Sequence, residues 1–579
     1  MTINCRSLRS KEKQNFLKSI IEHEKPDIIC GQESHLDKTI KSSEVFPDNY
    51  TIERNDRTLG GGGVFIATKD DLIVSEQPQL DTSCEIQWVK LELQGKSPLY
   101  IGSYYRAPDI DKDKISNLRE SLNTLYSERH TTLPNVILTG DFNVPSIDWS
   151  KLSVNQNPQY GNEINDELVN IVKDYSLNQT VLEKTRSENI LDLILTTYPG
   201  QLENTTTIPG MSDHSAVTTL INLRPQRAKK LPRKIYLYKK ADNKMIEEEL
   251  EQFTNTFFQE NPMNRTPKEN WMIIKENIFK IINKHIPMRT IKGKTDVPWI
   301  TLKIKRMIKK RGRIYKSLRK RPTNEVQRKY NSLEKAIKSE LRSEYNKYIS
   351  ELLDETIHKD PRKFYQFINS KSNDSKTIPP LKKADGTMAV DDKGKADVLN
   401  RQYQSVFTVE QLENMPTLNN TDIYNMPDIT FDLNGIEKLM GNLNVNKANG
   451  PDNIPIRILK EHRKHIAPLL QFIFKQTYDS GILPDDWLTA NVVPIFKKGS
   501  KMDAANYRPV SLTAVTCKMI EHIIHKSIAT HLSQNNFLSP YQHGFRSKHS
   551  CESQLIITLD DLHRSLDKKK QTDLAILDF

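Results

Sequence analysis

The chain has 579 residues, of which 36% are hydrophobic and 27% are charged, and its formal net charge is +12. This length is enough for several domains and this composition is that of a globular protein, which argues against a single core and against a disordered or fibrous chain. Lysine and arginine side chains that neutralise phosphates release condensed counterions. The basic balance therefore favours a polyanionic partner, and nucleic acid is the best fit.

The five cysteines are scattered along the chain and form neither a CxxC pair nor a Cys/His cluster at zinc spacing. We expect them to be reduced intracellular thiols. No apolar run approaches the roughly 20 residues that span a bilayer, and the first residues lack the hydrophobic region of a secretory signal. We therefore expect no membrane partner.

Up to about residue 223, short apolar runs alternate with amphipathic segments, which predicts a layered α/β domain. Polar side chains stand where the predicted strands end: Glu33 follows one run, Tyr105 ends the next, and Asp141 ends a third. Asn143 comes two residues after Asp141, and the string Ser-Asp-His at 212–214 borders another apparent strand. Acids, an amide and an imidazole should therefore meet on one rim of a sheet.

This combination predicts a metal-dependent site that cleaves phosphodiesters. Magnesium, or manganese in its place, is commonly held by one or two carboxylates together with substrate phosphate. Glu33 with Asn4 would be an adequate metal site, and Asp213 would support the metal. We expect no small-molecule cofactor beyond the metal.

The other polar residues of this set have expected roles in catalysis. Asp141 would orient or deprotonate the attacking water, while Asn143 and Tyr105 would donate hydrogen bonds to phosphate oxygens. His214, oriented by Asp192, would act as acid or base or would stabilise the transition state. Each motif alone also has a plain structural explanation, such as a turn after a strand or a helix cap. Their joint occurrence favours the catalytic interpretation.

After about residue 224 the pattern becomes helical, with apolar residues at helical spacing. Between residues 303 and 321 basic residues accumulate with no acid among them, including Lys309, Lys310, Arg311 and Arg313. A solvated helix face is one explanation, and a helix that lies along a phosphate backbone is the other. Interleaved apolar and aromatic residues favour the second.

The residues singled out between 4 and 214 occur in the order typical of the endonuclease/exonuclease/phosphatase superfamily, and nearly all of residues 1–223 resembles it. The strings Asn-Cys-Arg-Ser-Leu at 4–8 and Tyr-Arg-Ala-Pro at 105–108 are most similar to the nuclease branch of jockey-type non-LTR retrotransposons. The resemblance implies a four-layer α/β sandwich that nicks target DNA with Mg²⁺ and leaves a 3′-hydroxyl for priming. Only three residues precede Asn4, so we expect an incomplete first strand.

A second resemblance covers roughly residues 295–579. The strings at 446–455, 494–500, 506–512 and 542–546 are similar to the fingers and N-terminal extension of a non-LTR retrotransposon reverse transcriptase, which implies an RNA template as a partner.

In that setting, four cations would bind nucleotide or template phosphates, with arginine offering a bidentate fork: Lys497, Lys498, Arg508 and Arg546. Ordinary solvated surface is the alternative for them. By the same resemblance, Asp578 matches the first metal-binding aspartate of the polymerase palm.

Two-metal nucleotidyl transfer needs further carboxylates, which the resemblance places beyond residue 579. We therefore expect an incomplete reverse transcriptase that does not polymerise, and a C-terminal unit with exposed apolar surface around a predicted strand at 574–579. The sequence predicts three parts: an endonuclease-type domain at 1–223, a mainly helical basic linker and reverse transcriptase N-terminal extension at 224–430, and incomplete fingers with the start of the palm at 431–579.

The leading hypothesis is a retrotransposon-derived, Mg²⁺-dependent DNA endonuclease joined to an incomplete RNA-directed DNA polymerase, located in the nucleus and cytoplasm. A catalytically inactive remnant that still binds nucleic acid is the alternative. A hydrolase of lipid or inositol phosphates ranks last, because a polymerase-like second half does not serve that function.

Overall fold

The chain folds into two compact units, each assembled from separated stretches. The computed structural model describes residues 1–127, 133–156, 158–228, 233–291, 297–359, 361–372, 378–408 and 425–577. Unit 1 contains Met1–Arg233, Lys292–Gln402 and Lys498–Asn506, and unit 2 contains Lys234–Ile291, Tyr403–Lys497 and Tyr507–Phe579. These units follow the contacts of the fold, while the three-part division of the sequence stays a prediction.

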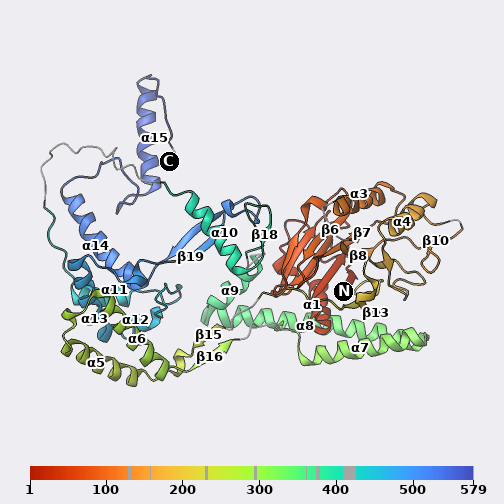
Figure 1. Ribbon diagram of the computed structural model, residues 1–579, viewed down its shortest axis with the longest axis horizontal. Helices are drawn as coiled ribbons and strands as arrows, with labels where there is room; N and C mark the ends of the chain where they lie inside the picture. Colours follow the sequence, from red (N-terminus) through yellow and green to blue (C-terminus); the bar gives the residue numbers. More distant parts are fainter. Residues whose placement is uncertain are drawn as a thin grey trace. The chain divides into compact units, whose positions relative to one another are not determined.

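Two six-stranded sheets form the centre of unit 1 (Figure 1). The first has the order β13 (Leu202–Ile208), β14 (Ala216–Ile221), β1 (Thr2–Asn4), β2 (Ile28–Gln32), β4 (Val64–Lys69) and β3 (Tyr50–Asn55). The second has the order β11 (Asn178–Gln179), β12 (Asp192–Thr196), β8 (Asn135–Asp141), β7 (Leu99–Tyr105), β6 (Glu85–Leu91) and β5 (Val74–Glu76). In each sheet one central pair is parallel, β1 with β2 and β7 with β8.

The two sheets pack face to face and carry helices on their outer faces. Cys30, Ile101 and Ile137 belong to the apolar cluster between the sheets. Helices α3 (Asp113–Ser127) and α4 (Asn162–Asp174) cover the second sheet, and α1 (Lys11–Glu24) covers the first. Because the central strands are buried on both faces, they read as continuous apolar runs. The four-layer α/β sandwich predicted from the sequence is confirmed.

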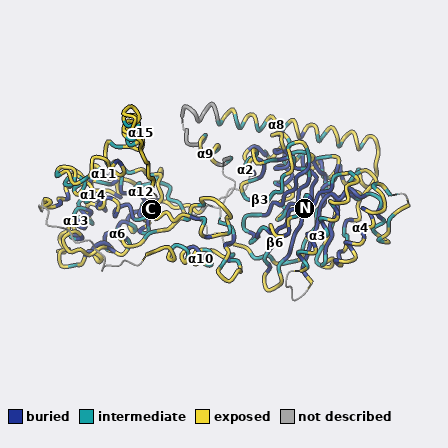
Figure 2. The backbone as a smooth tube through the Cα atoms, turned by 90° about the horizontal axis from the view of Figure 1, so that it is seen from above, coloured by how far each residue is buried: buried dark blue, intermediate teal, exposed yellow. Residues whose placement is uncertain are grey.

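The basic segment of the sequence forms α7 (Leu302–Lys320), which turns into the long helix α8 (Asn324–Lys359). Both helices pack on the α1 side of unit 1, and Figure 2 shows α8 along its outside. Ile304 and Ile308 lie in one apolar cluster with Phe16 of α1. Helices α7 and α8, which lie beyond residue 223, therefore contribute to the core of unit 1.

This packing corrects one expectation for the basic helix. Arg311, which we expected to bind phosphate, is only 2% exposed. Its guanidinium lies 4.9 Å from the centre of the Phe16 ring and donates a hydrogen bond to the Pro209 carbonyl at 3.1 Å. A guanidinium buried in this way cannot reach a nucleic-acid backbone, whereas Lys309, Lys310 and Arg313 are exposed.

Unit 2 is mainly helical and has its own apolar core. Its longer elements are α5 (Asn243–Gln259), α6 (Pro267–His285), α11 (Leu433–Gly441), α12 (Ile456–Glu461), α13 (Arg463–Ser480) and α14 (Val515–Gln534), with the hairpin of β19 (Asn491–Phe496) and β20 (Tyr507–Leu512). The run expected as a strand at 491–496 is β19. On this hairpin Val493, Ile495 and Val510 are exposed.

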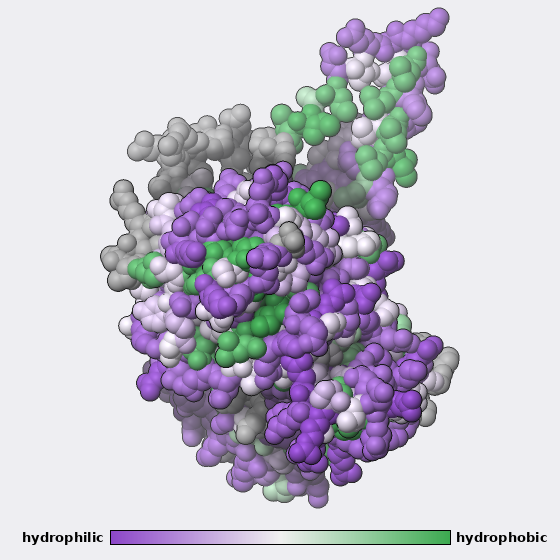
Figure 3. All heavy atoms as spheres, turned by 90° about the vertical axis from the view of Figure 1, so that its right-hand side faces the viewer, coloured by the Kyte–Doolittle hydropathy of each residue, from purple (hydrophilic) through white to green (hydrophobic). Residues whose placement is uncertain are grey.

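The end of the chain differs from the sequence prediction. The described residues 574–577 form no strand, and Leu574, Ile576 and Leu577 are exposed, because no neighbouring strand in the described chain pairs with them. Helix α15 (Cys551–Asp567) buries none of its residues. Figure 3 shows apolar side chains at the surface of this projecting segment, at the top of the view. Asp578 lies outside the described residues.

Of the remaining helices and strands, α9 has 12 residues and α10 has 14, and the others have two to four. They are α2 (Ser42–Val45), β9 (Ile147–Asp148), β10 (Ser153–Val154), β15 (Arg233–Tyr236), β16 (Met288–Ile291), α9 (Pro361–Ser372), β17 (Leu381–Lys382), β18 (Met388–Ala389) and α10 (Asp392–Ser405). Among the described residues, none of the helices combines the length and the apolarity that a membrane span requires.

The packing of α7 on unit 1 predicts unequal effects of two neighbouring substitutions. Ile308→Ala should lower the free energy of unfolding by about 2–5 kcal/mol, because it removes buried methyl groups and leaves a cavity. Lys309→Ala, at the next and exposed position, should change it by less than about 0.5 kcal/mol. Thermal and urea unfolding of the full chain measures both. Equal stability of the two variants would mean that α7 does not pack on this domain.

Candidate active site

The predicted polar residues meet at one rim of the two packed sheets. Asn4 and Glu33 stand at the carboxyl ends of the parallel strands β1 and β2, and Tyr105 and Asp141 end β7 and β8. Asp192 opens β12, which runs antiparallel to β8 and pairs Asp192 with Asp141. His214 lies just before β14, which runs antiparallel to β1. The strand directions thus bring six separated positions to the same rim.

Two glycines allow the chain to pass closely beneath this rim. A Cβ atom added at Gly140 would lie 1.8 Å from the Tyr104 carbonyl oxygen, and one at Gly210 would lie 2.1 Å from the carbonyl oxygen of His214. Neither backbone contact leaves room for a side chain. Gly140 therefore sets the position of Asp141, and Gly210 sets that of the loop that carries His214.

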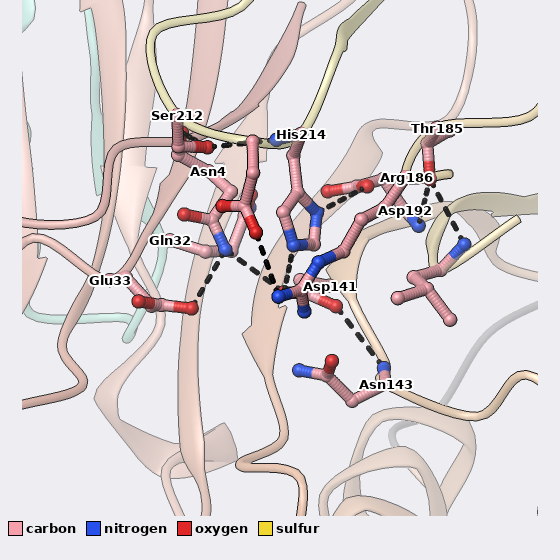
Figure 4. Close-up of polar contacts among 12 residues, drawn as sticks. Asn4, Gln32, Glu33, Asp141, Asn143, Thr185, Arg186, Asp192, Ser212 and His214 are labelled. Carbon is pink, nitrogen blue, oxygen red and sulfur yellow. Dashed lines mark hydrogen bonds and ion pairs between the residues drawn. The ribbon is translucent and has the colours of Figure 1, made fainter. Parts of the chain in front are cut away.

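Asn4 connects two carboxylates that come from different sheets (Figure 4). Its Nδ2 donates to Glu33 Oε1 at 2.9 Å and to Asp141 Oδ2 at 2.9 Å, and its Oδ1 accepts the backbone N–H of Arg6 at 3.1 Å. That third bond fixes which end of the amide faces the acids. We expected Asn4 to be a metal ligand, but here its nitrogen, and not its oxygen, faces the carboxylates.

His214 lies between two buried carboxylates. Its Nδ1 is 2.8 Å from Asp192 Oδ2, and its Nε2 is 3.8 Å from Asp141 Oδ2. All three side chains are almost fully buried. The Nδ1 bond to Asp192 orients the ring as predicted and leaves Nε2 as the nitrogen on the Asp141 side.

Burial and neighbouring charges shift the pKa values of His214 and Asp141, and each of the two residues affects the pKa of the other. Burial alone would lower the pKa of His214, but the hydrogen bond and the charge of Asp192, with the charge of Asp141, outweigh burial and raise it to about 9. Burial and the nearby charge of Asp192 raise the pKa of Asp141, and His214 opposes that rise. The imidazolium is therefore the favoured form of His214 at neutral pH in the metal-free protein.

Tyr105 and Asn143 also belong to the rim. Burial, followed by the charges of Glu33 and Asp141, raises the pKa of Tyr105, so its hydroxyl stays protonated and can donate. The backbone N–H of Asn143 donates to Asp141 Oδ1 at 3.2 Å, and its side-chain amide donates to the Arg106 carbonyl at 2.8 Å. Asn143 thus holds the turn after β8 in addition to any contact with a substrate.

Asp213, which was predicted to support the metal, forms ion pairs with two arginines. Arg6 Nη1 lies 3.1 Å from its Oδ1, and Arg186 Nη2 lies 2.7 Å from its Oδ2. Its carboxylate is therefore engaged by two guanidinium groups, and not by the buried group around His214. Because two guanidinium groups already lie at its oxygens, electrostatic repulsion disfavours the binding of a metal cation to the same carboxylate.

Two sets of side chains could hold a divalent cation. Glu33 and Asp141 present oxygens to the same Asn4 nitrogen, which suits a hard cation that keeps several waters. Asp141, Asp192 and His214 also bring one ligand atom each within 4.8 Å of one another. Because Nδ1 of His214 already bonds Asp192, and because a nitrogen ligand suits Mg²⁺ less well than oxygen, the chemistry of the donors favours Glu33 and Asp141.

The cations predicted to bind nucleic acid occupy three places outside this rim. Lys309, Lys310 and Arg313 line the exposed side of α7. Lys497 and Lys498 follow β19, and Arg508 is exposed on β20 opposite Ile495. Arg546 donates to the Ser539 carbonyl at 2.7 Å. Their role in binding stays a prediction.

Three residues that were not predicted from the sequence also support the rim: Thr185, Arg6 and Arg186. Thr185 Oγ1 accepts the backbone N–H groups of Leu191 at 3.0 Å and Asp192 at 3.1 Å, where β12 begins. Arg6 and Arg186 hold Asp213. Arg6 lies within the string at 4–8 that we had noted, so its position beside Asn4 was the available signal. Thr185 and Arg186 precede β12 by several residues, and no feature of the sequence indicated their roles.

A family comparison adds to this geometry. Residues 99–218 match the sequence profile of a family described as endonuclease-reverse transcriptase. The matched stretch contains Tyr105, Asp141, Asp192 and His214, while Asn4 and Glu33 lie before it.

Curated relatives agree with that match. The RNA-directed DNA polymerase from mobile element jockey of Drosophila melanogaster is 27% identical over 154 residues, which are 26% of this chain and 17% of the jockey protein. The resemblance to jockey-type retrotransposon proteins is confirmed. The probable RNA-directed DNA polymerase from transposon X-element of the same organism is 25% identical over 207 residues, 34% of this chain and 23% of that protein. The match thus spans less than a quarter of each relative.

Solved structures with similar folds include a retrotransposon nuclease. The endonuclease domain of TRAS1, a telomere-specific non-LTR retrotransposon, is 17% identical with a TM-score of 0.30, over 38% of this chain and 97% of that one. The 3′–5′ exonuclease NExo from Neisseria meningitidis is 16% identical with a TM-score of 0.30, over 38% of this chain and 98% of that one.

The buried ion pair predicts a pH response of His214 in the metal-free protein. In EDTA, Asp192→Asn should lower the pKa of His214 from its raised value near 9, because burial is then opposed by less negative charge. The stabilisation from the pair is fully present below the unfolded value of about 6.5 and is lost as the pH rises through about 9. NMR titration of the imidazole signals measures the shift, and Asp148→Asn on β9 is the control. An unchanged His214 pKa in Asp192→Asn would contradict the pairing.

Proposed function

We propose that unit 1 is a divalent-metal-dependent DNA endonuclease of the retrotransposon type. The observation that carries this proposal is the unbroken series of polar contacts from Glu33 through Asn4, Asp141 and His214 to Asp192. It supports the proposal because it brings carboxylate oxygens that could hold a cation and a buried imidazole to one rim, and metal-dependent phosphodiester hydrolysis uses both kinds of group.

The side chains divide the chemical work between them. Glu33 and Asp141 would hold Mg²⁺ or Mn²⁺, which when bound supplies positive charge beside the phosphoryl oxygens. Asp141, the most buried acid, orients or deprotonates the attacking water. His214 Nε2–H, turned toward the Asp141 side because Nδ1 bonds Asp192, stabilises the negative charge that develops on the phosphate.

The remaining rim residues position the substrate. The Tyr105 hydroxyl, kept protonated by its raised pKa, donates to a phosphate oxygen. Asn143 holds the turn that carries Asp141 and offers its amide to the same phosphate. Asn4 keeps the two acids in a fixed relation, since one amide nitrogen bonds both of them.

Two observations support the proposal that the substrate is DNA and that the nuclease acts together with the reverse transcriptase of a mobile element. A protein with a net charge of +12 is better suited to bind a polyanion than to bind a small lipid or inositol phosphate. The relatives that match this chain are named as RNA-directed DNA polymerases. By this proposal the nick in target DNA primes reverse transcription, with RNA as the template, as the resemblance implied.

A plasmid assay tests the endonuclease. The full chain should convert supercoiled plasmid to the nicked form with Mg²⁺ and not with EDTA. His214→Ala should lower the rate by about 10²–10⁴-fold, because a positioned acid or charge stabiliser is lost, and Asp141→Ala should do the same or more.

Asp148→Ala, which removes a half-buried carboxylate on β9, is the matched control and should nick like the wild type. Equal nicking by all of the proteins would identify a contaminating nuclease. Absence of nicking by the well-folded wild type would favour the alternative, a nucleic-acid-binding remnant without activity.

The exposed face of α7 is a second DNA-binding candidate. Replacing Lys309, Lys310 and Arg313 by alanine should reduce the slope of log K against log salt by about 0.9 for each phosphate that the variant no longer neutralises. A control triple variant replaces Lys96, Lys151 and Lys173, which are exposed elsewhere on unit 1. Fluorescence anisotropy with a labelled duplex measures the slope. The same slope in both triple variants would leave α7 as solvated surface.

A further inference from the structure

Asp213 and its two arginine partners form a distinct group at the active-site rim. Each oxygen of the carboxylate has its own guanidinium, Arg6 at Oδ1 and Arg186 at Oδ2. The two arginines come from loops that are far apart in the sequence, after β1 and before β12. We call Arg6, Asp213 and Arg186 the arginine clamp.

The arginine clamp is joined to the catalytic residues at each of its three members. The backbone N–H of Arg6 donates to Asn4 Oδ1, so the loop is tied to the amide that bridges Glu33 and Asp141. Arg186 follows Thr185, whose hydroxyl accepts the backbone N–H of Asp192. Asp213 directly precedes His214. A group bound by the clamp is therefore held in register with the proposed cleavage site.

The charge and exposure of the clamp suit an anion. Two guanidinium groups face one carboxylate, which leaves one positive charge in surplus. The Arg6 side chain is 62% exposed and that of Arg186 is 40% exposed. Across the described residues, the bond to Asp213 is the one side-chain hydrogen bond or ion pair recorded for each guanidinium. Since a guanidinium carries five N–H donors, both arginines keep donors for a ligand from solvent.

The backbone around Arg6 supports a functional role for this geometry. Arg6 and Ser7 both have positive φ, 44° and 81°, a conformation that costs free energy in a residue other than glycine. The Arg6 N–H bond to Asn4 and the Ser7 N–H bond to the Glu33 carbonyl, 2.8 Å long, hold this turn. A strained turn fixed by the catalytic residues themselves directs Arg6 to Asp213.

We propose that Arg6 and Arg186 together bind one DNA phosphate next to the phosphate that is cleaved. Asp213 positions the two arginines and is not a metal ligand. This deepens the endonuclease proposed above and rests on it for the location of the cleaved phosphate. The forked donors of arginine match two phosphate oxygens, and the shared carboxylate keeps both forks oriented before DNA arrives.

Equilibrium binding in EDTA tests the arginine clamp without any cleavage. The probe is a fluorescein-labelled DNA duplex, and its affinity for the full chain is measured by anisotropy over a series of KCl concentrations. Arg6→Ala and Arg186→Ala should each weaken binding and reduce the salt slope by about 0.9, the effect of one phosphate contact. Because the two arginines share one phosphate, the double variant should lose no more slope than either single variant.

Two further variants separate the clamp from general effects of charge and folding. Arg6→Lys keeps the charge and loses the fork, so it should retain the salt slope but bind more weakly than the wild type. Arg227→Ala is the matched control, because Arg227 is 41% exposed and also bonds two carboxylates, those of Asp27 and Asp71. Asp27 precedes β2 whereas Glu33 follows it, so Arg227 bonds a residue at the end of β2 opposite to the active-site rim. Arg227→Ala should bind like the wild type. Wild-type slopes in both Arg6→Ala and Arg186→Ala would overturn the clamp.

The metal requirement of nicking tests the role of Asp213. Asp213→Asn should need the same Mg²⁺ concentration for half-maximal nicking as the wild type, whereas Glu33→Gln should need several-fold more, because it loses a proposed ligand. A raised Mg²⁺ requirement in Asp213→Asn equal to that in Glu33→Gln would make Asp213 a ligand and overturn this assignment.

The two proposals fail in different ways. If the wild type does not nick, the endonuclease proposal fails, and the binding series in EDTA still decides whether the arginines hold a DNA phosphate. If the wild type nicks and the arginine variants bind DNA with wild-type slopes, only the clamp fails.

Discussion

One amide nitrogen joins the two sheets of unit 1 at the active-site rim. Asn4 donates 2.9 Å hydrogen bonds to Glu33, from its own sheet, and to Asp141, from the facing sheet. Two carboxylate groups held close together need a hydrogen-bond donor or a cation between their oxygens. The amide meets that requirement in the metal-free protein. Two further rim residues contact this arrangement, since His214 Nε2 lies 3.8 Å from Asp141 Oδ2 and the Arg6 backbone N–H donates to Asn4 Oδ1.

Electrostatic balance explains the division of the rim into two regions. In the buried region an imidazole lies between two carboxylates, and its pKa is raised by them in spite of burial. In the exposed region a carboxylate lies between two guanidinium groups. The Ser-Asp-His string at 212–214 contributes to both, since Asp213 bonds Arg6 and Arg186 while His214 bonds Asp192. One short string thus serves the chemistry and the proposed DNA contact.

Helix α7 shows how an amphipathic basic helix divides its faces. Its apolar residues and Arg311 face α1, while Lys309, Lys310 and Arg313 remain at the surface. The same helix supports the loop that carries His214, since the Tyr315 hydroxyl donates to Ser215 Oγ at 2.7 Å. Part of the segment that looked like a linker therefore contributes to the core of unit 1, and a truncation at residue 223 would remove that part.

The sequence by itself determined that Glu33, Asp141 and His214 lie at strand ends, because buried strands appear as apolar runs and the polar residues directly before or after them must lie at a rim. The alternation of apolar runs and amphipathic segments also determined a layered α/β domain, and the family resemblance implied its four layers. Only the tertiary structure decided which groups pair. Asp213 binds two arginines, Arg311 is buried, and residues 574–577 form no strand. Each of these depends on contacts between distant segments, and no local pattern encodes which long-range partner is near enough to neutralise a charge or to pair a strand.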